Sequence, residues 1–426
     1  MTIQAGLAEI EITPKTPGRK IGWIKLVVGE KVIDPLYARA CVLRAGDSAI
    51  GIIQLDTLSI RAADVDRFRQ AIRKRHGIAP ECVMVAATHN HAGPAVSDVG
   101  EVERDMEYVE FLAEKVAAVF DQAVANLRQA RIGLGHGFEF EIARNRRVVM
   151  RDGTVRTHHT FKDPDSLHLE GPIDPEVAVL ALRSADGAPL GTIVNYACHP
   201  THHGSSDEFS AGYPGVLAAK LKAAGWPVAM FLNGACGNLH DNDPFRGGTG
   251  QSKEHIGQTL AQDALAVIAG MTFTGAATVA GRSRRLQLPF RKPTQDEITG
   301  TIRGAQRFIG EVYYDRDIPL LLEKIRRLGA QPAEVQVLSV GDWDFVAIPA
   351  EYFVENGLKI KLGAFPRHAV VVSCANGMVG YVPHAAAFDR GGYETTFWSG
   401  SRLAPPAGDM LADCAIELIK SEGRRA

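Results

Sequence analysis

The feature that most constrains the fold is the alternation of short apolar, β-branched runs with longer stretches of helical periodicity. Apolar runs of this length, bounded by turn residues, predict strands buried within sheets. We expect strands over residues 41–44, 50–55, 82–87, 177–182, 191–197, 228–232, 276–288, 335–340, 345–348 and 369–373. Helices are expected over residues 62–75, 102–127, 213–223, 253–269, 295–308, 318–327, 352–362 and 407–420. This interleaving predicts an α/β (mixed) fold, with layered mixed β-sheets flanked by helices.

The chain has 426 residues, of which 46% are hydrophobic and 23% are charged, as in globular proteins with a large core. No linker-like or low-complexity stretch divides it, so we expect a single domain over residues 1–426. The 47 basic residues nearly balance the 49 acidic ones, which argues against attraction to nucleic acid or anionic lipid. We therefore expect a small-molecule substrate, no nucleic-acid partner and no stable membrane association. The oligomeric state is left open.

Two further features concern the location of the protein. Residues 1–14 lack a basic segment followed by an apolar run, and no stretch approaches the roughly 20 apolar residues of a membrane span, so we expect a cytoplasmic protein. The six cysteines are widely scattered, which favours buried free thiols over disulfides. A nucleophilic role for Cys198 or Cys236 is a minor alternative, because no nearby pattern specifies a thiolate.

Several apolar runs end abruptly in polar residues, and in layered α/β proteins strand ends are where sites are assembled. The run over residues 83–87 leads into His89 and His91. Two histidines at positions i and i+2 of an extended backbone point the same way, so both can approach one metal or one substrate. The alternative is a pair of histidines that only end a strand.

Three further strand ends carry similar groups. His199 follows the run over residues 191–197. The small residues 234–237 follow the run over residues 228–232, where they either present N–H groups to a negative charge or only make a tight turn. Glu351 follows the run over residues 345–348, either as an ordinary acidic residue at a helix start or as the oxygen ligand of a His/His/Glu zinc site. Tyr381 and Tyr393 lie in a glycine-rich region, where phenols pack, bind metal or donate to an oxyanion.

Taken in order, these motifs resemble the neutral/alkaline non-lysosomal ceramidase family and its bacterial relatives. The resemblance also includes residues 6–14, Asp56, residues 145–147 and residues 172–176, and it spans most of the chain. Its motifs are Thr88-His89-Asn90-His91-Ala92-Gly93-Pro94, Asn195 with His199-Pro200, Gly234-Ala235-Cys236-Gly237-Asn238, Pro349-Ala350-Glu351, and Asn376 with Tyr381 and Tyr393-Glu394.

The resemblance implies one zinc ion, with a zinc-bound water as the attacking group. The implied metal ligands are His89, His199, Glu351 and Tyr381. It also implies that His91 transfers protons or contacts substrate beside the metal, and that Tyr393 and Arg146 are candidates to polarise the scissile carbonyl. Which histidine of His89 and His91 binds the metal stays open. The ligand set suits zinc and tolerates manganese or iron.

The chain departs from the family pattern at two carboxylates. Asn238 and Gly212 stand where relatives carry aspartate, which argues for altered specificity more than for a lost metal. His240 lies near a serine proposed as catalytic in some relatives, which weakens a serine mechanism. His158 and His159 are expected in an exposed loop, either as a specificity element or without a role.

No segment resembles the C-terminal immunoglobulin-like domain of true ceramidases, so we expect a bacterial ceramidase-like hydrolase that acts on a small soluble substrate rather than on long-chain ceramide. The function that the sequence predicts is zinc-dependent hydrolysis of a C–N amide-type bond. The alternatives are a zinc esterase or lactonase with the same site, or a metal-binding homologue without catalysis.

Overall fold

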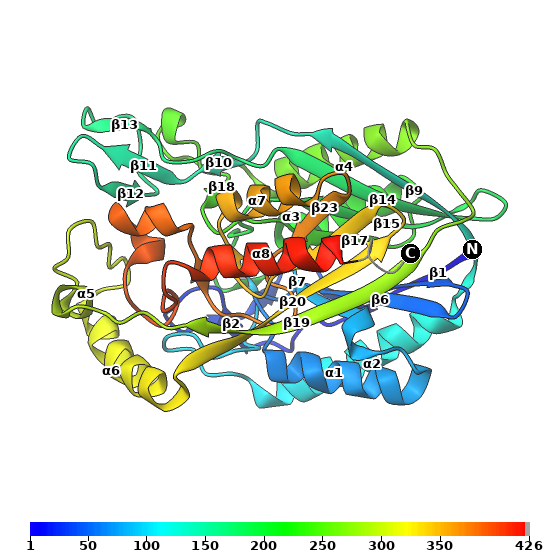
Figure 1. Cartoon of the computed structure of the whole chain (residues 1–426), viewed down its shortest axis with the longest axis horizontal. Coiled ribbons are helices and arrows are strands. Elements are labelled where there is room, and N and C mark those ends of the chain that lie inside the picture. The colour runs from blue at the N-terminus through cyan, green and yellow to red at the C-terminus, as the bar shows by residue number, and fades with distance from the viewer. Residues whose placement is uncertain (422–426) are drawn as a thin grey trace.

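The computed structural model describes residues 1–421. Two β-sheets stack face to face, and helices cover the outer surface of each, so the layers run helix, sheet, sheet, helix (Figure 1). The predicted α/β (mixed) fold with layered sheets flanked by helices is confirmed.

The larger sheet has eight strands, and it is mixed because its two edge pairs, β15–β17 and β6–β7, are parallel while its other pairs are antiparallel. Strands β1 and β9 pair over only two residues, so the sheet opens into two four-stranded halves, and β17 lies against β6 and β7. In spatial order the strands are β17 (Ala229–Asn233), β15 (Pro189–Tyr196), β14 (Glu176–Ser184), β9 (Arg128–Phe138), β1 (Ile3–Glu11), β5 (Tyr37–Ala45), β6 (Ser48–Leu55) and β7 (Val83–Ala87).

The smaller sheet has four strands, which are antiparallel except for the parallel pair β21–β23. Because side chains alternate between the two faces of a strand, one face of this sheet supplies Leu338, Phe345 and Val370 to the core shared with the larger sheet. The strands in spatial order are β19 (Val279–Pro289), β20 (Ala330–Val340), β21 (Trp343–Ala347) and β23 (His368–Val372).

Six long helices form the outer layers. Helices α1 (Ala62–His76) and α2 (Met106–Ala125) cover one half of the larger sheet, while α3 (Gly212–Ala223) and α4 (Lys253–Ala269) cover the other half. The smaller sheet is covered by α7 (Val354–Ala364) and α8 (Ala407–Lys420). The buried side chains of α2 recur at helical spacing, for example at Leu112, Val116 and Val119, which gives the helix one apolar face toward the sheet.

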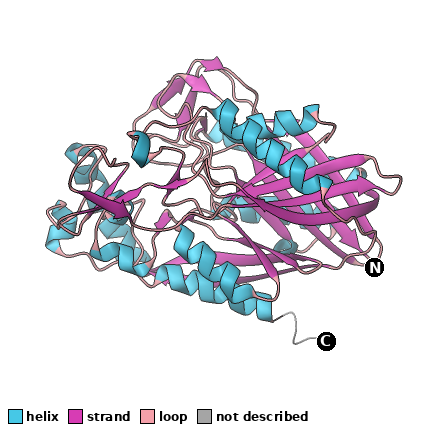
Figure 2. Cartoon of the chain, turned by 90° about the horizontal axis from the view of Figure 1, so that it is seen from above, coloured by secondary structure: helices cyan, strands magenta, loops and turns pink. Residues whose placement is uncertain are grey.

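The long strands gather at the end of the molecule that carries the N-terminus, and loops with short elements fill the other end (Figure 2). Two further helices are α5 (Gln295–Thr299) and α6 (Glu311–Leu328). The short strands are β2 (Gly18–Ile21), β3 (Val27–Gly29), β4 (Lys31–Val32), β8 (Gly93–Pro94), β10 (Arg144–Asn145), β11 (Arg147–Met150), β12 (Val155–Thr157), β13 (Ser166–Leu169), β16 (Glu208–Phe209), β18 (Leu239–His240), β22 (Glu351–Tyr352) and β24 (Tyr381–Val382). The four 3₁₀ helices are Pro80–Cys82, Pro244–Arg246, Ala385–Asp389 and Tyr393–Thr395.

Four of the elements differ most from the sequence predictions. Strands β1 and β9 were not predicted. The helix expected over residues 295–308 is only the short α5, which ends at Gly300 with a φ of 71°, a conformation that glycine adopts at helix ends. Helix α6 begins at Glu311 rather than at residue 318, and Pro319 lies inside it.

All six cysteines are free, and five of them are buried. Within residues 1–421, no helix has the length and apolar character needed to cross a membrane.

Candidate metal centre

The ends of strands from both sheets meet at one place. Residues after β23 join the sheets: Ser373 N–H donates to the carbonyl of Asn233 (2.9 Å), and Ala87 N–H donates to the carbonyl of Cys374 (3.1 Å). Because β6 and β7 are parallel neighbours, as are β15 and β17 and also β21 and β23, the segments that leave the strands of each pair emerge side by side. His89, His199 and Glu351 lie on three such segments.

His89 and His199 are buried and are oriented in the same way. The Nδ1 atom of His89 lies 2.9 Å from the carbonyl oxygen of Leu58, and that of His199 lies 3.0 Å from the carbonyl oxygen of Cys236. A carbonyl only accepts hydrogen bonds, so each Nδ1 carries the proton and each Nε2 presents a lone pair. This tautomer is the one that metal-binding histidines commonly adopt.

The free nitrogens of three histidines converge. The Nε2 atoms of His89 and His199 are 3.0 Å apart, and Nε2 of His91 lies 3.3 Å from that of His89. One carboxylate oxygen of Glu351 lies 3.4 Å from Nε2 of His89 and of His199. Ligand atoms about 2.0–2.1 Å from a tetrahedral zinc are roughly 3.3 Å apart, so this donor set fits such an ion.

Burial and neighbouring charges set the protonation states that a metal requires. Burial lowers the pKa of His199 to about 3, and Arg146 and His89 add to the effect. Burial also lowers the pKa of His91, with His89 and His199 contributing. Burial opposes ionisation of Glu351, but His89 and His199 hold its pKa well below the usual value. Near neutral pH the imidazoles of His91 and His199 are therefore neutral, and the carboxyl group of Glu351 is ionised.

The two tyrosines and the arginine that the resemblance implies lie next to this group. Tyr381 is directly opposite Glu351 in the short parallel ladder of β22 and β24. The Nη2 atom of Arg146 donates to the hydroxyl of Tyr381 (3.3 Å) and to the carbonyl of Gly237 (2.7 Å), while its Nε donates to Glu394 (2.8 Å). The rings of Tyr381 and Tyr393 are 5.6 Å apart, centre to centre.

A large cavity leads to this group. Its volume is about 1300 Å³, above the roughly 300–1,000 Å³ common for small-molecule sites. Its walls include His89, His91, Glu351, Tyr381 and Tyr393. His199 and Arg146 lie behind these residues rather than in the wall itself.

Two histidines without a predicted metal role also lie near the centre. The ring of His240 is stacked 6.5 Å from that of His199, and the ring of His158 lies 4.8 Å from that of His240. Nε2 of His240 is 2.7 Å from the hydroxyl of Thr201. The signal in the sequence for His240 is that it closely follows the third strand-end motif. For His158 it is the loop that was considered as a specificity element.

Asn238 and Gly212, the two departures from the pattern of the resemblance, both have structural roles. The amide of Asn238 donates to Glu355 (2.9 Å), and its oxygen accepts from Val354 N–H, the first residue of α7 (2.9 Å). Gly212 begins α3 with a φ of 63°, in the left-handed region that glycine tolerates best.

Within residues 1–421, a second group of side chains has donor atoms close enough to share a metal ion. Glu176 lies 2.6 Å from Nε2 of His368 and 3.8 Å from Nδ1 of His136, and the amino group of Lys361 is 2.7 Å from its other oxygen. Burial alone would raise the pKa of Glu176, but His368 and Lys361 lower it to about 2. This carboxylate already has a cation as partner, which the first group lacks.

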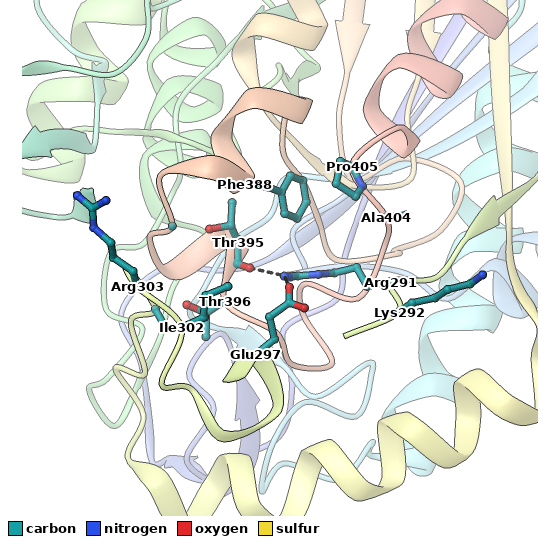
Figure 3. Close-up of a pocket in the computed structure, with 12 residues that line it drawn as sticks. Arg291, Lys292, Glu297, Ile302, Arg303, Phe388, Thr395, Thr396, Ala404 and Pro405 are labelled. Atoms are coloured by element: carbon teal, nitrogen blue, oxygen red, sulfur yellow. Dashed lines mark hydrogen bonds and ion pairs between the residues drawn. The ribbon is translucent and has the colours of Figure 1, made fainter. Parts of the chain in front are cut away.

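A smaller cavity of about 190 Å³ lies apart from the histidines (Figure 3). Arg291 reaches across it, where its guanidinium donates to the carbonyl of Thr395 (2.6 Å) and pairs with Glu297. Its charge is therefore satisfied by the protein itself.

The two stacked sheets with a histidine and glutamate cluster at their strand ends form a fold that is also found in ceramidases. Two solved structures share it. A ceramidase complexed with C2 superposes with a TM-score of 0.78 at 18% identity, covering 100% of this chain and 76% of its own. The crystal structure of neutral ceramidase from Pseudomonas aeruginosa gives 0.74 at 20% identity, covering 99% of this chain and 75% of its own.

The sequence comparison agrees. Neutral ceramidase of Pseudomonas aeruginosa is 24% identical over 282 residues, which are 64% of this chain and 39% of that protein. The match thus spans about two fifths of the relative's length. No family model matches the chain. The predicted resemblance to the neutral ceramidases is confirmed.

Proposed function

We propose that this protein is a zinc-dependent hydrolase that cleaves a C–N amide-type bond of a small soluble substrate. The observation that carries the proposal is the 3.0 Å separation between the Nε2 atoms of His89 and His199, whose Nδ1 atoms both face carbonyls. Two lone pairs repel at this distance unless a cation lies between them. The relative named neutral ceramidase supports the choice of bond.

In this proposal the metal ligands are His89, His199, Glu351 and Tyr381. When bound, zinc supplies a water of lowered pKa and stabilises negative charge on the carbonyl oxygen. His91 lines the cavity and is neutral, so its Nε2 can take up a proton and return it to the leaving nitrogen.

The remaining roles follow from the contacts. Tyr393 lines the cavity, and its hydroxyl is the group that we propose donates to the carbonyl oxygen of the substrate. Arg146 is held by Glu394 and by the carbonyl of Gly237, so we assign it an indirect part: its hydrogen bond to Tyr381 favours the ionised phenol.

The first experiment is elemental analysis of the wild-type protein beside His89→Ala and His199→Ala, with His368→Ala from the second histidine group as the matched control. We expect about one zinc per chain in the wild type and in the control, and none in the two variants. Absence of metal from the wild type, or zinc retained in both variants, contradicts the proposed centre. Amide and ester substrates, each tested with and without a chelator, then separate amidase, esterase and non-catalytic proteins.

Two broader statements remain predictions. We propose that the chain forms one catalytic domain, because the candidate centre takes side chains from both sheets. The cytoplasmic location stays a prediction from the sequence.

A further inference from the structure

The large cavity contains cationic side chains that the protein itself leaves unpaired. Lys324 of α6 and Arg402 both line it, and within residues 1–421 neither lies within ion-pair distance of a carboxylate. Lys25 and Arg316 line it as well, but they are exposed and therefore hydrated. Lys324 and Arg402 are half-buried and buried, respectively.

Two further cations of this cavity wall are paired with carboxylates. Arg61 pairs with Asp98, and Arg285 pairs with Asp66 at 2.7 Å. Arg291, in the smaller cavity, pairs with Glu297 (Figure 3).

Arg402 is only 9% exposed, and all the acceptors that it contacts are uncharged. Its Nε and Nη2 donate to the side-chain oxygen of Gln331 at 3.3 and 3.2 Å, and its Nη1 donates to the carbonyl of Ser399. A guanidinium has five N–H donors, so two remain for a ligand. A buried charge without a counter-ion is costly, and an anion that enters the cavity removes that cost.

The charges that act on the two side chains differ: Lys324 has three cationic neighbours, whereas Asp317 is the charged group that acts on Arg402. Burial lowers the pKa of Arg402 to about 10, with Asp317 as the opposing charge. Burial also lowers the pKa of Lys324. The charges of Arg402, Arg327 and Arg61 lower it further, and that of Asp317 opposes them. Asp317 accepts hydrogen bonds from the backbone N–H of Ser399 (2.7 Å) and from its hydroxyl, and it pairs with neither cation.

We propose that Lys324 and Arg402 bind a carboxylate of the substrate, so that this hydrolase acts on amides that carry an anionic group, such as N-acyl amino acids. The inference rests on the proposed function, because it assigns a substrate class to the same centre. His89, His91 and Glu351 line the same cavity, so one molecule can reach both the candidate centre and the cations. In the reaction the C–N bond breaks, the oxygen of water joins the carbonyl carbon, and a proton goes to the leaving nitrogen.

The test compares matched substrates on the intact enzyme. The N-hexanoyl derivatives of glycine, β-alanine and 4-aminobutyrate are each paired with a neutral partner in which –CH₂OH replaces the carboxylate. This series varies the distance between the amide and the charge. We expect the wild type to favour the acid in at least one pair by about tenfold or more in kcat/KM, as a charge-assisted hydrogen bond predicts.

In Arg402→Gln and in Lys324→Met, we expect that acid-to-neutral ratio to fall by about tenfold, mainly through the KM of the acid. Arg285→Gln is the matched control, because it removes a cation from the same wall that is already paired with Asp66. Its ratio should equal that of the wild type. Equal turnover of acids and neutral partners by the wild type, or an equal loss for both in the two variants, overturns the proposal.

Calorimetry separates this proposal from the proposed function. Octanoate and octanol are titrated into the intact protein and into Arg402→Gln. Octanoate binding that weakens about tenfold in the variant, with no comparable change for octanol, supports the anion site even if no amide is cleaved. Octanoate binding that is absent, or equal in the two proteins, overturns the anion site even if amides are cleaved.

Discussion

At the scale of single residues, Asn238 bonds two groups that an aspartate could not bond together. Its amide N–H₂ donates to Glu355 and its oxygen accepts from Val354 N–H. An aspartate would keep the acceptor and lose the donor, and it would bring a second negative charge against Glu355. Burial already raises the pKa of that carboxyl. An asparagine rather than an aspartate at this position therefore suits the glutamate beside it.

We expect Asn238→Asp to destabilise the protein by about 1–3 kcal/mol at neutral pH, because a buried hydrogen bond is replaced by charge repulsion. The measurement is the melting temperature at pH 7. Combining it with Glu355→Gln should restore most of the loss, since a glutamine amide can donate to the new carboxylate. A double variant no more stable than the single one would show that the pair is not coupled.

The residues of the candidate centre differ in how visible they are in the sequence. His89, His91, His199 and Glu351 each follow an apolar run, which made them candidates, and the resemblance supplied their roles. Their convergence on one point was not predictable from spacing, because it depends on how the two sheets meet. Lys324 carries no such signal, since a lysine in a helical pattern is normally a solvated residue, and only the cavity gives it a role.

At the scale of elements, Gly237 packs between β22 and Arg146 and bonds to both. A Cβ atom at this position would lie 2.5 Å from the backbone oxygen of Glu351. The N–H of Gly237 donates to the carbonyl of Tyr352 (2.8 Å), and its own carbonyl accepts from Arg146. Only glycine allows the segment after β17 to approach β22 this closely.

We expect Gly237→Ala to displace Glu351 and to weaken zinc binding by roughly 10–100-fold, the range found for disturbed support of metal ligands. Competition with a chelator of known affinity measures the change. Gly275→Ala is the control, because a Cβ atom there meets no atom within 4 Å. Unchanged affinity in Gly237→Ala would show that the backbone yields without moving the carboxylate.

Helix α4 contains a carboxyl group, that of Asp263, whose ionisation at neutral pH destabilises the folded protein. Burial, together with Glu139, raises the pKa of Asp263 to about 6 from an ordinary value near 3.8. Below about pH 4 this group is protonated in both the folded and the unfolded chain. As the pH rises through 6, the folded protein must ionise a partly buried carboxyl that the unfolded chain ionises freely, so stability is lost.

Asp263→Asn should therefore raise the melting temperature at pH 8 and leave it unchanged at pH 4. The expected gain is about 1 kcal/mol, because partial exposure screens the charge. Thermal unfolding at the two pH values measures it, with Glu254→Gln in the first turn of the same helix as the control. An equal gain at both pH values would assign the effect to packing rather than to ionisation.

Element type was predictable where one period dominates the sequence, as in α2, α4 and α8 or in the apolar strands β6 and β7. It was not predictable for β9, which has arginines and three glycines among its residues and is held in the sheet by two neighbours. The segment after α5 kept a helical pattern in the sequence, but Gly300 ends the helix there. Pairing with two neighbouring strands decided the first case, and a left-handed glycine decided the second. A periodic pattern in the sequence reports neither of these.

At the scale of the whole molecule, the proposed ligands come from both sheets. His89 and His199 follow strands of the larger sheet, and Glu351 follows β21 of the smaller one. A metal bound by all three would connect the two layers. Such a ligand binds the folded chain but not the unfolded one, and it stabilises the former according to its affinity.

We expect chelation to lower the melting temperature of the wild-type protein, by an amount equivalent to about 3–4 kcal/mol for a site held at 100 to 1,000 times its dissociation constant. His89→Ala should melt at the lower temperature and should not respond to the chelator. Differential scanning calorimetry makes both comparisons. A chelator effect of equal size in His89→Ala would place the stabilising ion elsewhere.

The order of these groups along the chain has a consequence during synthesis. The three histidines precede Glu351 and Tyr381 by about 150 residues or more, which a ribosome adds in roughly 10–30 s. During that interval the nascent polypeptide offers imidazoles without the carboxylate, and imidazole ligands bind copper and nickel as well as zinc. In the proposed function, the oxygen ligands are therefore the last members of the ligand set to be synthesised.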